Sequence, residues 1–162
     1  NELFEFYDVD TIIRIGTAGS MQKDVKLHDI VIATAACSES SINDNLFGNV
    51  HFSPTPEFDM LVKAYNKAKE LDYTTHCGQV LSSDQFYSTT PDYVMENLQK
   101  YGVLCVEMEA YGLFTLAKKH GKRGLGIFTI SDSLVENIAD SAEARETSYT
   151  NMMKLALEIA EE

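Results

Sequence analysis

The chain has 162 residues, of which 44% are hydrophobic and 23% charged, a balance typical of one globular domain with a real core. Its formal net charge of −12 works against a duplex-binding surface, so we do not expect nucleic acid as a partner. Three cysteines without CxxC spacing favour reduced thiols in a cytoplasmic protein, and no apolar run reaches the roughly 20 residues of a membrane span.

Apolar runs predict five strands along the chain. Their continuous rather than alternating character favours strands that are covered on both faces. The expected strands are residues 11–16, 29–36, 75–83, 103–108 and 124–131, the third being the weakest, and the opening "NELFEFYDVD" leads directly into the first.

Helices are expected between these strands. Thr55 is a candidate cap for a helix with apolar residues at helical spacing over 58–68, and Thr90 with Pro91 repeats the device for a helix that Gly102 can end. Two more helices are expected over 109–121 and from about 140 to the end of the chain. Alternation of strands and helices predicts an α/β fold over residues 1–162, with three α/β/α layers around a mixed, largely parallel sheet. Ligands bind such sheets beyond the carboxyl ends of the strands.

The first strand ends in "RIGTAGS", residues 14–20. Two glycines could let the backbone turn and expose N–H groups, while Arg14 adds a planar cation and Thr17 a hydroxyl. These groups together could bind phosphate. The alternative is a glycine-rich turn in which Arg14 pairs with a carboxylate.

The fourth strand ends in "VEMEA", residues 106–110. Glu107 and Glu109 would share a face if this segment were a strand, and a carboxylate can accept from the two neighbouring hydroxyls of a ribose. Met108 could pack against a sugar or a base. The alternative is that both glutamates are first-turn acids of the following helix.

The fifth strand ends at Ser131 and Asp132. A carboxylate at the mouth of a buried strand can act as a general acid, and Arg145, thirteen residues further on, could fold back over it. The alternative is that Asp132 is a helix-capping or turn residue. In "SSDQFYS", residues 82–88, Phe86 offers a stacking surface, and we interpret Tyr87 as ordinary core packing.

These four stretches, in this order and spacing, resemble the hexameric bacterial-type purine nucleoside phosphorylases of the nucleoside phosphorylase/nucleosidase superfamily. The resemblance covers essentially the whole chain. It implies the reversible phosphorolysis of purine ribonucleosides or deoxyribonucleosides to a free base and (deoxy)ribose 1-phosphate. Inorganic phosphate would be a co-substrate, and no cofactor or metal is implied.

The resemblance also implies roles for individual residues. Arg14 and Thr17, where the family usually has serine, would bind phosphate, and Glu109 would bind the sugar 2′- and 3′-hydroxyls. Asp132, beside Ser131, would protonate purine N7 with the help of Arg145. The remaining nucleoside-pocket residues implied are Phe86, which flanks the purine, with Val106, Glu107 and Met108.

The resemblance finally implies a homo-oligomer, a hexamer built from dimers. Family members carry an earlier segment with further phosphate ligands, so we expect a companion segment that supplies it. Three alternatives stay open: a nucleosidase that uses water, a uridine phosphorylase of the same superfamily, and a non-catalytic nucleoside-binding protein.

Overall fold

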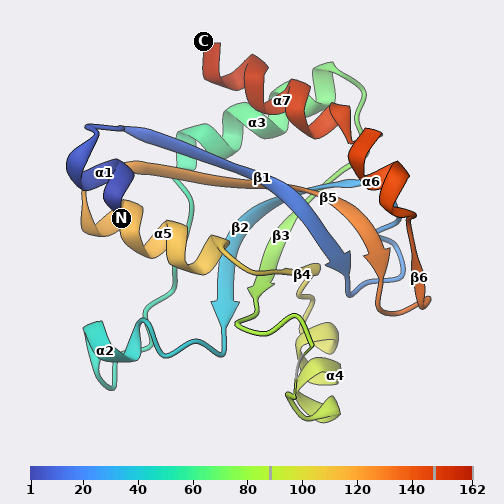
Figure 1. The fold of residues 1–162 in the computed structure, drawn as a ribbon, viewed down its shortest axis with the longest axis horizontal. Helices are drawn as coiled ribbons and strands as arrows, with labels where there is room; N and C mark the ends of the chain where they lie inside the picture. The colour runs from blue at the N-terminus through green and yellow to red at the C-terminus, as the bar shows by residue number, and fades with distance from the viewer. Residues whose placement is uncertain (88, 148, 162) are drawn as a thin grey trace.

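Within residues 1–87, 89–147 and 149–161, which the computed structural model describes, the chain forms a six-stranded sheet with helices on both faces (Figure 1). The strands are β1 (Thr11–Ser20), β2 (Ile30–Ser38), β3 (Thr75–Ser82), β4 (Cys105–Glu107), β5 (Arg123–Ser133) and β6 (Ile138–Ala139). The helices are α1 (Glu2–Phe6), α2 (Asp44–Phe47), α3 (Phe58–Glu70), α4 (Asp92–Lys100), α5 (Ala110–Lys119), α6 (Ala142–Thr147) and α7 (Thr150–Glu161). The predicted α/β class is confirmed.

The sheet is mixed, as predicted, and it closes on itself through a pairing between β1 and β5. Its strand order is β1-β4-β3-β2-β5-β6, with an additional pairing between β1 and β5. The two longest ladders, β1–β5 and β2–β3, are parallel, whereas β1–β4 and β2–β5 are antiparallel. Because β1 pairs along its length with β5 and at its end with β4, the ends of these three strands lie together.

Two hydrophobic clusters cover the two faces of the sheet. Successive residues of a strand belong to different clusters. In β2, Ile32 packs against α3 and α7, while Val31 packs against α5. Ile127 and Phe128 of β5 divide in the same way. This is the physical reason for the continuous apolar runs, since each side chain buried on either face contributes about 1.5–3 kcal/mol.

The first and last expected elements differ from the structure. β1 does not end at Gly16 but continues to Ser20, because its parallel ladder with β5 extends that far, with one register shift between Ala18 and Gly19. The expected turn at "GTAGS" is therefore wrong. The opening residues form the short helix α1, and the expected long C-terminal helix consists of two helices, α6 and α7.

The start of α3 differs from the prediction, and the end of α4 agrees with it. Helix α3 begins after Glu57 rather than Thr55, because the Glu57 carboxylate accepts hydrogen bonds from the backbone N–H groups of Asp59 and Met60. Gly102, after α4, has a φ of 83°, so its predicted left-handed conformation is confirmed. In the described part of the chain, no helix has the length and apolar character needed to cross a membrane.

Candidate active site

The ends of β1, β4 and β5 meet at Gly19. Gly19 is the register partner of Val106 in β4 and of Asp132 in β5. A Cβ atom on Gly19 would lie 2.6 Å from Asp132 Oδ2 and 3.4 Å from Val106 Cγ1. A side chain at position 19 would therefore displace the Asp132 carboxylate, and glycine is required here for this close approach. Three of the four sequence motifs come together at this point.

Arg14, earlier on β1, forms an ion pair with Glu109, which follows β4. Arg14 Nη2 lies 2.5 Å from Glu109 Oε2, and Nη1 donates to the carbonyl oxygen of Ile15 at 2.8 Å. The guanidinium extends along β1 over Gly16, where a Cβ atom would come within 3.0 Å of it. The pairing with a carboxylate that the sequence left open is thus present, and it joins the residues expected to bind phosphate and sugar. Both side chains remain partly exposed, at 34% and 53%.

Glu107, in contrast, is buried beneath the start of α5. Its carboxylate accepts hydrogen bonds from the Ser82 hydroxyl and from the backbone N–H groups of Glu109 and Ala110, at 2.9 and 3.0 Å for the two amides. Burial raises the pKa of Glu107, while the hydrogen bonds from Ser82 and the two amides oppose that rise. Glu107 therefore stabilises a helix N-terminus, the arrangement that the sequence offered as the alternative for this acid.

Asp132 lies one residue before the end of β5. The Ser131 hydroxyl donates to Asp132 Oδ1 at 2.8 Å, which fixes the orientation of the carboxylate. Arg145 lies on α6 with an exposed side chain, and among the residues that the structure describes no ion pair joins it to Asp132. The structure thus joins Ser131 to Asp132 by a hydrogen bond, whereas Arg145 and Asp132, both within the described residues, make no direct ion pair.

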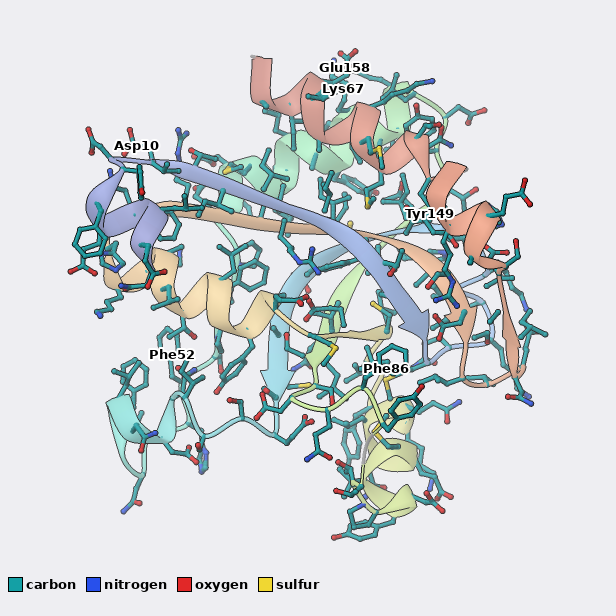
Figure 2. The ribbon with its side chains drawn as sticks, viewed as in Figure 1. Asp10, Phe52, Lys67, Phe86, Tyr149 and Glu158 are labelled. Carbon is teal, nitrogen blue, oxygen red and sulfur yellow. The ribbon has the colours of Figure 1, made fainter. Side chains whose placement is uncertain are left out.

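A cavity of about 430 Å³ adjoins the site, and Phe86 and Val106 line it. Phe86 follows β3, in the loop above α4 in Figure 2, and is 76% exposed. Tyr87, which the sequence assigned to core packing, is 88% exposed; that assignment is wrong, because Tyr87 lies in the surface loop and contacts Phe86 edge-on. A second cavity of about 930 Å³ lies between β1, α3 and α7 and contains none of the expected site residues.

The other two expected residues, Thr17 and Met108, are both exposed to solvent. Thr17 is exposed on β1, three residues beyond Arg14, and Met108 is 40% exposed between the two glutamates. The described part of the chain contains no group of three His, Cys, Asp or Glu side chains that could hold a metal ion.

Sequence reasoning missed two residues of the site. In the sequence, Gly19 indicates only a turn, and Ser82, in "SSDQFYS", carries no signal for a role. The signal for Gly19 is a glycine in a strand next to polar strand ends, which often marks the close approach of another group. Only the contact with Glu107 identifies Ser82.

The fold and the site define an α/β protein in which an arginine of β1 pairs with a glutamate that follows β4, and an aspartate of β5 packs against β1. The family model of the Phosphorylase superfamily matches residues 2–162. A purine nucleoside phosphorylase of the DeoD type from Thermoanaerobacter sp. (strain X514) is 48% identical over 161 residues, which are 99% of this chain and 69% of that protein. Its namesake from Clostridium novyi (strain NT) is 46% identical over 161 residues, with the same shares. The chain belongs to the Phosphorylase superfamily.

Proposed function

We propose that this chain carries the active site of a purine nucleoside phosphorylase. The reaction is the reversible phosphorolysis of purine ribonucleosides or deoxyribonucleosides to a free base and (deoxy)ribose 1-phosphate. Two observations carry the proposal, in a chain 46–48% identical to DeoD-type enzymes: Arg14 of β1 pairs with Glu109, which follows β4, and Asp132 of β5 packs against Gly19 of the same strand β1.

In this proposal Arg14 and Glu109 bind the two substrates. A guanidinium offers phosphate two parallel N–H donors, and the Thr17 hydroxyl offers a third. A carboxylate accepts hydrogen bonds from both sugar hydroxyls. The ion pair at 2.5 Å supports the assignment, because it keeps two opposite charges side by side where phosphate must reach the sugar. Phosphate and nucleoside binding exchange this pair for contacts with the substrates.

Asp132 acts on the departing base. Cleavage of the C1′–N9 bond leaves its electron pair on the purine, and a proton from Asp132 to N7 neutralises the developing charge. A phosphate oxygen then forms the new bond to C1′. A positioned general acid contributes roughly 10²- to 10⁴-fold in rate. The Ser131 hydroxyl, 2.8 Å from Asp132 Oδ1, and the packing over Gly19 orient this carboxylate. In this proposal Arg145 moves from α6 towards Asp132 and assists the protonation.

The cavity beside Phe86 and Val106 receives the base, with Met108 against the sugar. Its apolar lining suits a flat heterocycle. No cofactor or metal takes part in the proposed chemistry, since phosphate is itself the co-substrate. The cytoplasmic location expected from the three cysteines, all free thiols, belongs to the same proposal.

The release of purine base with and without inorganic phosphate tests the proposal. We expect adenosine or inosine to be cleaved only when phosphate is present. Cleavage in phosphate-free buffer would indicate a nucleosidase, and preference for uridine would indicate a pyrimidine enzyme. Nucleoside binding without turnover would indicate a binding protein. Each of these results would overturn the proposed function.

We further propose that the chain works in a homo-oligomer, a hexamer built from dimers. The segment around α2 supports this, since it exposes Leu46, Phe47 and Val50, and Phe47 stacks on Phe52 with ring centroids 4.6 Å apart. Exposed apolar groups gathered in one segment are typical of a surface that another copy covers. Light scattering on the active protein tests this, and an active monomer would contradict it.

A further inference from the structure

The N-terminus of α5 is capped by two residues from outside the helix. An N-cap side chain ordinarily accepts a hydrogen bond from one of the first amides of its helix. Glu109 occupies the N-cap position of α5, with a φ of −136°, yet its side chain makes no such bond. Instead Glu107 accepts from the amides of Glu109 and Ala110, and the Ser82 hydroxyl oxygen accepts from the amide of Tyr111 at 2.9 Å.

These two capping residues are held rigidly. The Ser82 hydroxyl donates to Glu107, so the two side chains act as one unit, and they are only 3% and 4% exposed. The carbonyl oxygen of Ser82 accepts from the Ser38 hydroxyl at 2.6 Å, and the backbone N–H of Ser83 donates to the Glu107 carbonyl oxygen at 2.8 Å. The ends of β2, β3 and β4 are thereby fixed to the start of α5.

The capping by Ser82 and Glu107 determines what the Glu109 side chain contacts. Because Ser82 and Glu107 satisfy the first amides of α5, the Glu109 carboxylate is not needed at the helix end and instead meets Arg14 at 2.5 Å. We propose that Ser82 and Glu107 are positioning residues that free the Glu109 carboxylate and aim it into the site. This inference rests on the proposed function, in which Glu109 binds the sugar hydroxyls.

The test is nucleoside binding measured by calorimetry without phosphate, so that no turnover occurs. Ser82→Ala leaves the Tyr111 amide without its acceptor and loosens Glu107. We expect the Kd of a purine ribonucleoside to rise about tenfold, and that of the matching 2′,3′-dideoxynucleoside to change less than twofold, because it lacks the hydroxyls that Glu109 binds. Glu107→Gln should act in the same direction, because its amide nitrogen opposes a backbone N–H.

Thr115→Val is the matched control. It also deletes one buried hydroxyl, but that of Thr115 lies within α5 and donates to the Tyr111 carbonyl oxygen at 2.8 Å instead of accepting from an amide at the helix start. We expect both Kd values to stay near wild type in this variant. In a Glu109→Ala background, Ser82→Ala should cause no further loss of ribonucleoside affinity. Equal weakening of both nucleosides, or an additional loss without Glu109, would overturn the proposal.

Hydrogen exchange separates this inference from the proposed function. Exchange of the Ala110 and Tyr111 amides does not depend on a substrate and should accelerate in Ser82→Ala. If the wild-type protein binds the ribonucleoside but exchange of these two amides is unchanged in Ser82→Ala, the capping inference is overturned and the proposed function is not. A wild-type protein that binds no ribonucleoside would overturn the proposed function, and the role of Glu109 with it, even if exchange accelerates.

Discussion

Replacing Gly19 by alanine tests the geometry at the centre of the site. The new Cβ would lie 2.6 Å from Asp132 Oδ2, whereas ordinary contacts begin at 3.4 Å, so the carboxylate must move by the difference, about 0.8 Å. A misplacement of about 1 Å can cost on the order of 10²-fold in rate, which equals about 2.7 kcal/mol of transition-state stabilisation. Gly19 is not among the residues with positive φ, so the backbone accepts alanine without strain.

The assay is steady-state phosphorolysis by the intact protein, with kcat and KM measured separately. We expect Gly19→Ala to lower kcat about 10²-fold with little change in melting temperature. Gly112→Ala, in α5, is the control, since its Cβ would meet no atom within 4 Å, and its kcat should stay at the wild-type value. A wild-type kcat in Gly19→Ala, or a further loss when it is added to Asp132→Asn, would refute the reasoning.

Four further predictions follow from named groups. Asp132→Asn should lower kcat far more than it weakens nucleoside binding, because the proton matters mainly in the transition state, and wild-type turnover at saturating substrate would contradict this. Arg14→Ala should raise the KM for phosphate well above its effect on the KM for nucleoside, whereas equal effects would indicate a structural arginine. Burial raises the pKa of Glu107, so the folded state holds this proton more tightly than the unfolded state. The resulting stability is complete at pH values below the ordinary carboxyl pKa and is lost as the pH rises through the raised pKa of Glu107. The difference in unfolding free energy between wild type and Glu107→Gln, measured by urea titration, should therefore shrink as the pH rises. A difference that does not change with pH would count against this prediction. A thiol reagent should label the exposed Cys77 first and the buried Cys105 last, since burial raises the Cys105 pKa strongly, and mass spectrometry of partly labelled protein checks the order.

The sequence predicted the fold better than the details of the site. Continuous apolar runs identify β2 and β5 because their neighbouring residues, such as Ile127 and Phe128, are buried on opposite faces. The end of β1 was misjudged, since glycines in "GTAGS" suit a turn as well as a strand that passes close to a carboxylate. Only the ladder between β1 and β5 distinguishes the two.

In the candidate site, too, the sequence predicted which segments take part but not how individual side chains are placed. The motifs predicted which segments would meet, and the pairing of β1 with both β4 and β5 brings three of them together at Gly19. They could not tell that Glu107 and Glu109, two residues apart, have different surroundings, one buried under a helix and one paired with Arg14. That difference depends on the boundary between β4 and α5 and on Ser82, which is 25 residues away from Glu107 in the sequence.

The fate of phosphate tests the central claim most directly. In ³¹P NMR spectra of the intact protein with adenosine or inosine, the account predicts that a sugar 1-phosphate signal grows at the expense of inorganic phosphate, in equal amount to the free purine base. A free base that accumulates together with free ribose, while the inorganic phosphate signal stays constant, would contradict the account.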